Sequence, residues 1–252
     1  MYYPEKHSVK NYNFSPYIEG ISIGLVTLFS LQIVTHFLYY HARSAQDGEI
    51  KEGLARTARI VAASIDVEKH KQINDKDLQE SKLYQEALLP LKRAALSDPN
   101  IEYVYTNILE DEKIYFILDA AEGEDQSLIL DEYGDASSEL IEAFKKQTET
   151  VSEEPYEDEW GHHMSVYVPF YDDSEKLVGT LGIDINAKQY RDRLAPIKLA
   201  YQRASVASFV VSFFFGLAVS FLRNFAKQMN HSRQEISKDF QEFSQEIINK
   251  NG

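Results

Sequence analysis

Two long apolar runs near the ends of the chain dominate its hydrophobic pattern. The first occupies residues 17–40, and the second occupies residues 204–222 without a single charged side chain, between Arg203 and Arg223. Because a helix rises 1.5 Å per residue, about 20 apolar residues cross a hydrocarbon core of about 30 Å. The pattern therefore predicts two membrane-spanning helices at these positions.

Each run has an alternative interpretation. The first resembles the start of a cleaved signal peptide, with residues 42–44 (Ala-Arg-Ser) as a cleavage site. Its length and the weakly basic lead at residues 1–16 favour a membrane anchor instead. A buried core helix is the alternative for the second run, and it is disfavoured because no face of that helix is polar.

Between the two runs, the apolar spacing changes to that of amphipathic helices. A stripe with steps of four, four, three and four predicts a helix over 47–73, continuous with the first span. That stripe consists of Ile50, Leu54, Ala58, Val61 and Ile65. A shorter helix is predicted over 83–96, with Pro90 as a kink or break.

The middle of the chain then alternates between strand patterns and turn residues. Stretches rich in β-branched and aromatic residues predict a hairpin of 101–108 with 114–120. An acidic loop follows at 121–136, and a short helix begins at a Ser138 cap. The remaining predicted elements are strands near 150–152, at 163–171 and at 177–185, and a helix at 187–201 that leads into the second span. This order predicts an α+β domain with one antiparallel sheet and a long helix across one face.

Because successive side chains of a strand point to opposite sides, the residues of the last two predicted strands can be assigned to two faces. In 163–171, one face is apolar (Met164, Val166, Val168, Phe170) and the other is mixed (His163, Ser165, Tyr167, Tyr171). In 177–185, an otherwise apolar strand ends in Asp184. A carboxylate in such a strand needs a partner, water or a ligand, because its burial without one is costly.

Charge narrows the classes of partner. The chain carries a formal net charge of −14 and no cysteine. Residues 98–175 alone hold 3 basic and 23 acidic side chains. This argues against nucleic acid as a partner, since phosphate binding requires a basic surface. The acidity is most simply that of a solvated face.

The predicted organisation is a lead (1–16), a first span (17–40), an acidic domain (41–203), a second span (204–222) and a tail (223–252). Basic residues flank both spans on both sides, so the positive-inside rule gives little guidance. We place the acidic domain outside because the basic tail fits a cytoplasmic location. The tail's apolar stripe resembles an irregular coiled coil. It comprises Phe225, Met229, Ile236, Phe240, Phe243 and Ile247.

The motifs of the middle domain, taken in order, resemble the extracytoplasmic Cache family of PAS-like sensor domains. They are AASIDVEKH, NIEYVYTNI, IYFILD, PYEDEWG, VYVPFYDDSEKLVG and GTLGIDI, and the resemblance covers about residues 41–200. It implies a five-stranded antiparallel sheet in the order 2-1-5-4-3, with a ligand pocket on the face away from the long helix. It also implies a bacterial inner-membrane protein with a periplasmic or extracellular sensor domain. Unlike many family members, this sequence shows no fused output module.

The resemblance, combined with strand alternation, gives the candidate ligand-binding residues. These are Tyr105, Tyr115, Ser165, Tyr167 and Asp184, with Trp160 of the DEWG turn as a further contact. Aromatic walls with a few polar anchors are typical of small-ligand pockets. Alternatively, Asp184 caps the next helix or pairs with an arginine, the tyrosines only pack in the sheet, and Trp160 only stabilises a loop.

Metal, cofactor and catalytic sites are not expected. His162 and His163 are adjacent in a strand and point to opposite faces, so they are poorly placed to chelate one ion. The acidic loops lack a calcium-loop signature. No nucleophile elbow, phosphate loop or zinc motif occurs in the sequence. We therefore expect no enzyme activity.

Two functions remain. The first is a homodimeric transmembrane sensor that binds a small extracytoplasmic ligand and signals to a separate partner protein. The alternative is a non-sensing structural or accessory subunit of a bacterial membrane complex, with the Cache-like domain as a docking surface. The missing output module motivates this alternative.

Overall fold

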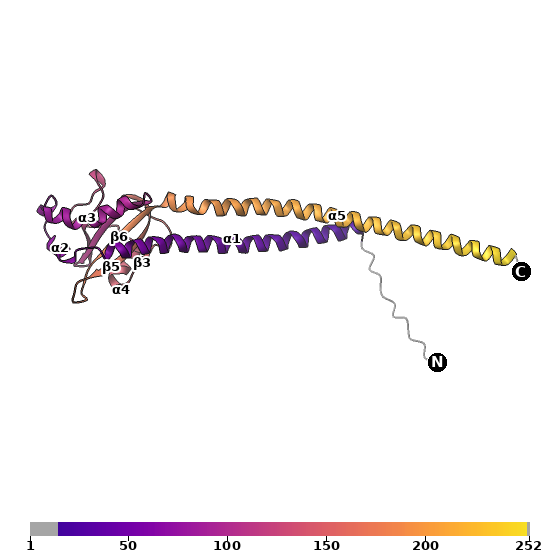
Figure 1. The fold of residues 1–252 in the computed structure, drawn as a ribbon, viewed down its shortest axis with the longest axis horizontal. Coiled ribbons are helices and arrows are strands. Elements are labelled where there is room, and N and C mark those ends of the chain that lie inside the picture. Colours follow the sequence, from indigo (N-terminus) through magenta and orange to yellow (C-terminus); the bar gives the residue numbers. More distant parts are fainter. Residues whose placement is uncertain (1–14, 251–252) are drawn as a thin grey trace, which may run out of the picture. The chain divides into compact units, whose positions relative to one another are not determined.

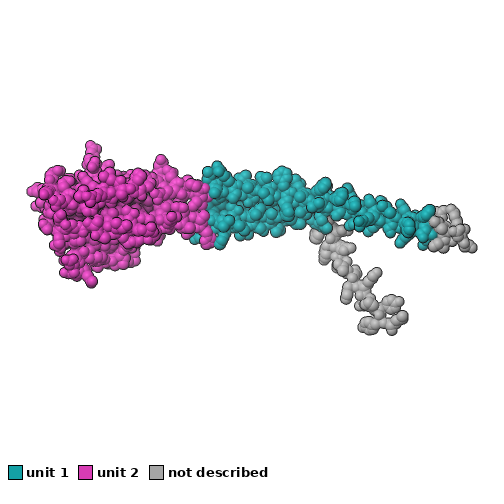
Figure 2. All heavy atoms as spheres, in the orientation of Figure 1, with its two compact units in different colours: residues 1–40, 198–252 teal, residues 41–197 magenta. Residues whose placement is uncertain are grey.

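The computed structural model describes residues 15–250, so the predicted lead at 1–16 lies almost wholly outside the described part. The chain divides into two compact units, and each is described by itself (Figure 2). One unit comprises residues 41–197. The other comprises residues 1–40 with 198–252.

The secondary structure is a mixture of helices and one sheet (Figure 1). The helices are α1 (Pro16–Ala62), α2 (Val67–Gln72), α3 (Lys82–Ser97), α4 (Ser138–Lys146) and α5 (Ala187–Lys250), with short 3₁₀ turns at Lys76–Leu78 and Gly123–Asp125. The strands are β1 (Ile101–Glu110), β2 (Lys113–Asp119), β3 (Thr150–Val151), β4 (Tyr156–Asp158), β5 (Gly161–Tyr171) and β6 (Leu177–Asn186).

The sheet is antiparallel and has β6 near its centre. Its order is β2-β1-β6-β5-β3, and β4 pairs with β5 outside this path. The expected sheet had five strands; the sixth is the three-residue β4, which the sequence pattern does not reveal. The expected α+β architecture, with a long N-terminal helix and an antiparallel sheet, is confirmed.

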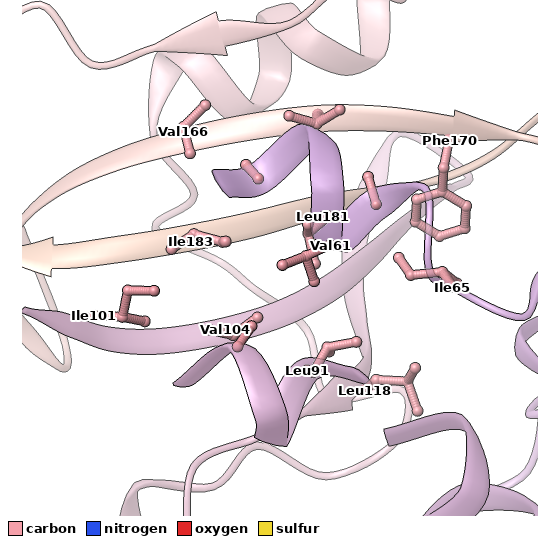
Figure 3. Close-up of a cluster of buried hydrophobic side chains, with 14 of the residues drawn as sticks. Val61, Ile65, Leu91, Ile101, Val104, Leu118, Val166, Phe170, Leu181 and Ile183 are labelled. Carbon is pink, nitrogen blue, oxygen red and sulfur yellow. The ribbon is translucent and has the colours of Figure 1, made fainter. Parts of the chain in front are cut away.

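One face of the sheet packs against α1 and α3. Figure 3 shows Val61 of α1 and Leu91 of α3 among the strand side chains of this core. The apolar face predicted for β5 lies here, as do Leu181 and Ile183 of β6. Burial of these side chains contributes about 1.5–3 kcal/mol each to stability. The opposite face carries a second cluster of mostly aromatic residues, covered by α4.

Three details of the predicted helices are wrong. The helix expected over 47–73 ends at Ala62, because Asp66 accepts a hydrogen bond from the Lys69 backbone and begins α2 as a new helix. Of the kink or break expected at Pro90, the break is absent, because α3 continues through Pro90 as one helix with buried residues on both sides of it. The cap of α4 is Ser137 rather than Ser138, since the Ser137 side chain accepts from the Leu140 backbone.

In the other unit, residues 16–40 of α1 and the adjacent part of α5 approach closely through small side chains. A Cβ added at Gly20 would lie 2.5 Å from the Gly216 carbonyl oxygen, and one added at Gly24 would lie 3.2 Å from the Ser212 carbonyl oxygen. Gln32 and Ser205 exchange hydrogen bonds of 3.0 and 3.2 Å between these helices. Small residues of this kind favour close helix packing in membranes.

Both helices are long and apolar enough to cross a membrane, by length and composition. The arginine predicted to flank the second run, Arg223, pairs with Glu19 near the start of α1. Along the tail part of α5, the described residues of the predicted stripe are exposed.

Candidate functional site

The pairing of three strands places Asp184 within the aromatic face of the sheet. In β6, Asp184 lies opposite Tyr103 of β1 on one side and opposite Ser165 of β5 on the other. Its side chain is 2% exposed. Two residues earlier in β6, Gly182 occupies the same face. The strand thus presents a small residue and a buried carboxylate side by side.

Gly182 makes room for the ring of Tyr105. A Cβ at position 182 would lie 2.5 Å from the Tyr105 ring, which is shorter than any tolerated contact. In the space that glycine leaves, Tyr105 extends along β6 and donates a hydrogen bond of 3.3 Å to Asp184 Oδ1. The missing side chain at 182 therefore positions the hydroxyl that contacts Asp184.

A second buried carboxylate, Asp158, organises the turn between β4 and β5. Its Oδ1 accepts from the backbone nitrogens of Trp160 (3.0 Å) and Gly161 (3.2 Å), and its Oδ2 accepts from the Tyr133 hydroxyl (2.9 Å). Gly161 has φ +135°, a conformation that favours glycine. This turn holds the Trp160 side chain beside Tyr133 and Phe116.

His163 lies between two carboxylates. Its Nε2 is 3.2 Å from Asp158 Oδ1 and its Nδ1 is 3.2 Å from Glu102 Oε2, with the ring 1% exposed. Neither contact has the alignment of a good hydrogen bond, so the attraction is chiefly electrostatic. A ring with an acidic oxygen at each nitrogen favours the doubly protonated, cationic form.

The pKa values of these groups agree with that arrangement. Burial lowers the pKa of His163, but Asp158, Asp184 and Glu102 outweigh burial and raise it. Burial raises the pKa of Asp158, but His163 and Tyr133 lower it below its usual value. Burial raises the pKa of Asp184 to about 7, against the opposing effects of hydrogen bonds from Ser165 and Tyr105 and the charge of His163. Ionised Asp184 is therefore the energetically costly member of the site.

A chain of hydroxyl groups runs from Asp184 toward α4. Tyr156 contacts both Ser165 Oγ (2.9 Å) and the Tyr167 hydroxyl (2.8 Å). Ser137, the cap of α4, donates to the Tyr167 hydroxyl over 3.0 Å. These hydroxyls satisfy one another, so the polar interior of the aromatic face is closed as a network.

The site encloses a cavity of about 10 Å³, which is the space of about one water molecule. Its lining is aromatic and acidic. The aromatic members are Tyr103, Tyr105, Phe116, Tyr133 and Trp160, the acidic members are Asp119, Asp125, Asp158 and Asp184, and Ser127 completes the lining. Any larger ligand has to displace part of this wall.

A wider groove of about 330 Å³ lies on the α1 side of the same unit. Its charged side chains have both signs, Glu49 and Asp98 with Arg56 and Arg193, and all four are exposed or half-buried. Such a lining has no deeply placed polar anchor. The aromatic face around Asp184 is the better candidate site.

Five of the six predicted ligand-binding residues meet at this face. Tyr105, Asp184 and Trp160 line the cavity, and Ser165 and Tyr167 belong to the hydroxyl network behind it. Tyr115 does not, because the phase of β2 is shifted by one residue. Phe116 packs in the aromatic cluster, and Tyr115 points to the other side of the strand.

Several residues of the site were missed by sequence reasoning. Tyr133 comes from the long loop before α4, and Tyr156 and Asp158 come from the short β4. A residue in a loop has no periodic pattern that could reveal its burial. The DEWG sequence, with Asp158 close to Trp160 and Gly161, indicates a turn but not a role for Asp158 in the site. The sequence pattern gives His163 no role in ligand binding. As predicted, His162 and His163 point to opposite faces of β5, and the structure shows that His163 is the buried one and His162 the exposed one.

Comparisons with known proteins add the following. No family model matches the chain, and no curated protein matches it. Among solved structures, it resembles the ligand-binding domain of the Campylobacter jejuni chemoreceptor Tlp3 in complex with L-valine, at 17% identity, covering 71% of this chain and 67% of that one, with a TM-score of 0.44. It also resembles the Escherichia coli DcuS sensor domain, at 15% identity, covering 60% of this chain and 98% of that one, with a TM-score of 0.43.

A third similar structure is the extracellular domain of the putative histidine kinase mmHK1S-Z2, at 15% identity, covering 58% of this chain and 57% of that one, with a TM-score of 0.37. These neighbours are a ligand-binding domain, a sensor domain and an extracellular domain, respectively. This chain spans about two thirds of the Tlp3 domain. Likeness at TM-scores below 0.5 carries no information about ligand or partner.

Proposed function

We propose that this chain is a membrane-anchored sensor subunit that binds a small molecule at the Asp184 site and signals to a separate protein. The observation that carries the proposal is the buried carboxylate of Asp184, bonded by hydroxyls and enclosed by aromatic rings at the cavity. A fold gains no stability from an ionised group placed there. Aromatic walls with convergent polar groups are typical of ligand sites.

The position of Asp184 along the chain suggests a route for the signal. β6 ends at Asn186 and α5 begins at Ala187, three residues after Asp184. The same helix continues through the second apolar run to the tail. A ligand that moves the end of β6 therefore acts on the first turn of α5, and a two-state shift of that helix is the proposed output.

The proposed topology is that of a two-pass protein of the bacterial inner membrane, with the acidic domain on the periplasmic or extracellular side. The length of the two apolar helices supports the membrane location. Long loops cross a membrane largely regardless of their charge, so the acidity of this domain does not oppose export.

Trp160 provides a direct test, because it is the only tryptophan of the chain and lines the cavity. The full chain in detergent is titrated with amines, amino acids, carboxylates and divalent cations, and its tryptophan emission is recorded. A ligand at 100 times its dissociation constant should also stabilise the fold by about 2.7 kcal/mol. No response to any of these classes at millimolar concentration would rule out the proposal.

Gly182→Ala is the matched variant for this titration. The added methyl group must displace the Tyr105 ring, so we expect at least a tenfold loss of affinity for any ligand found. Gly134→Ala is the control, since a Cβ at position 134 meets nothing within 4 Å. Equal losses in both variants would place the ligand elsewhere.

The tail is proposed to pair with the tail of a second copy. Its stripe follows steps of 4, 3 and 4 residues, repeated from Phe225 through Ser232 to Ile247, which is an 11-residue period. Such a period favours helices that associate with little or right-handed supercoiling. Met229, Ile236 and Phe240 are 46%, 68% and 71% exposed, and a second identical helix in register would cover them.

Cross-linking tests this pairing cleanly because the chain contains no cysteine. Met229→Cys, placed in the stripe, should form disulfide-linked dimers in membranes under mild oxidation. Lys227→Cys, two residues away and off the stripe, should form them at least several-fold more slowly. Equal rates for the two variants would contradict a specific pairing of the tails.

A further inference from the structure

The charge of the cavity lining narrows the class of ligand beyond the function proposed above, on which this inference rests. Among the described residues that line the cavity, four are aspartates and none is lysine, arginine or histidine. An anionic ligand, or a zwitterion with a free carboxylate, would find no cation to neutralise it there. Like charges placed together without water between them repel strongly.

The four aspartates are not equivalent. Asp119 accepts hydrogen bonds from the backbone nitrogens of Ala121 (2.9 Å) and Ser127 (2.7 Å), and Asp158 is occupied by the turn and by His163. Asp125 is exposed, at the loop end of the lining. Asp184 is the buried carboxylate whose partners are hydroxyls alone, so it is the one that a new donor would stabilise most.

The one nearby cation, His163, does not compensate for this charge. Both of its ring nitrogens already face carboxylates, Glu102 on one side and Asp158 on the other. Asp158 adds a second negative charge near Asp184. The remaining neighbours are phenol and serine hydroxyls on β1, β4 and β5, which supply no charge: Tyr103, Tyr105, Tyr156, Ser165 and Tyr167. When Asp184 is ionised, no cationic side chain is therefore available to pair with it alone.

The aromatic wall adds a second, independent feature. Tyr105, Phe116, Tyr133 and Trp160 are mutually packed, with ring centroids 4.8–6.2 Å apart. Aromatic faces attract ammonium groups, by about 2 kcal/mol or more when water is excluded. A primary ammonium also brings N–H donors, which a buried carboxylate needs.

From this lining we infer that the ligand is a primary alkylamine without a carboxylate, with its ammonium group on Asp184 and its alkyl chain against the aromatic wall. The ammonium group takes the water-sized cavity, and the chain takes the place of the displaced Trp160 ring. An α-amino acid is excluded by its carboxylate, which would lie among the aspartates. The Trp160 emission must change on binding for the same reason.

Four small molecules of similar shape but different charge show whether binding depends on the charge of the ligand or only on its size. The full chain in detergent is titrated with isobutylamine, isobutanol, L-valine and isovalerate, with Trp160 emission as the readout. Isobutylamine should bind at least tenfold more tightly than each of the others. Binding should be lost in Asp184→Asn and kept in Asp173→Asn, which changes an exposed aspartate outside the cavity.

The dependence on pH is a second readout. An alkylamine stays protonated below pH 9, so the changes in the acid range come from the protein: Asp184, which would hold the ammonium group, with Asp119 in the lining and His163 beside Asp158 as further groups whose pKa values are raised. Because bound ammonium requires the ionised carboxylate, affinity should fall roughly 25-fold from pH 7.5 to pH 5.5. An affinity that does not change, or that rises toward acid, would contradict the pairing of ammonium with Asp184.

The outcomes distinguish this inference from the proposed function. If isobutanol matches isobutylamine, or if L-valine or isovalerate binds as tightly, the site binds ligands but is not selective for amines, and only the inference fails. If none of the four binds and no other class alters Trp160 emission, the proposed function itself fails. Tight binding of isobutylamine alone, lost in Asp184→Asn, supports both.

Discussion

Replacing Asp158 by alanine is expected to remove about 3–5 kcal/mol from the free energy of unfolding. The change leaves His163 as a buried cation with one partner fewer, and leaves the Tyr133 hydroxyl and two backbone nitrogens without an acceptor. A domain of this size has a total stability of about 5–15 kcal/mol, so the loss is a large share of it. Urea unfolding followed by Trp160 emission, with circular dichroism as a second signal, measures the effect.

Two control variants show whether the pairing with His163 is the cause. Asp158→Asn retains an acceptor for the turn but not the charge, so it should lose less stability than alanine. Its His163 should also titrate at a lower pH, which nuclear magnetic resonance can follow. Asp173→Ala, at an exposed position, should change stability by less than about 0.5 kcal/mol. If Asp158→Ala is as mild as Asp173→Ala, the buried network is not what holds the turn.

The variant Asp184→Asn is expected to be more stable than the parent chain at pH 8. Burial raises the pKa of Asp184 from an ordinary value of 3.8 to about 7, so the folded state holds its proton more strongly than the unfolded state. This group's contribution to stability is therefore complete below about pH 4 and is lost as pH rises to about 7. The loss is on the order of 4 kcal/mol.

The measurement is the free energy of unfolding of the Asp184→Asn variant minus that of the parent chain, taken at several pH values between 4 and 8. Other groups also titrate there. Burial raises the pKa of Asp119 to about 6, and His163 also has a raised pKa, so both reduce stability as pH increases. The contribution of Asp119 is common to parent and variant and cancels in the difference, whereas that of His163 shrinks in the variant because the charge of Asp184 helps to raise the His163 pKa. If this difference in the free energy of unfolding does not grow between pH 4 and pH 7, ionisation of Asp184 does not destabilise the folded state.

Much of the fold can be predicted from the sequence because its signals are periodic. The stripe from Ile50 to Ile65, the hairpin and the alternation in β5 each correspond to a buried face, and the elements they predict exist. The errors in helix boundaries occur where the side chain of a helix-capping residue, rather than the spacing of apolar residues, determines where the helix begins. Asp66 ends one helix and starts another, and Ser137 rather than its neighbour begins α4.

The candidate site was predictable only in part, for a different reason. Asp184, Ser165 and Tyr167 lie on long strands with a clear phase, and the structure brings them together. Tyr115 was misplaced because two faces of β2 are both partly apolar, so alternation alone cannot choose between Tyr115 and Phe116. Tyr133 and Asp158 come from segments whose positions are fixed by tertiary hydrogen bonds, which leave no trace in local pattern.

The contact between Gly182 and Tyr105 has a consequence for the evolution of this chain. The ring occupies the volume that any side chain at position 182 would need, so residue 182 cannot become larger unless residue 105 becomes smaller. A descendant with a larger residue at 182 must shorten the residue at 105, and it then loses the hydroxyl that reaches Asp184. Residues 182 and 105 should therefore vary together among homologues. Homologues with glycine at 182 and tyrosine at 105 should retain the Asp184 site, and those with a larger residue at 182 should lack it.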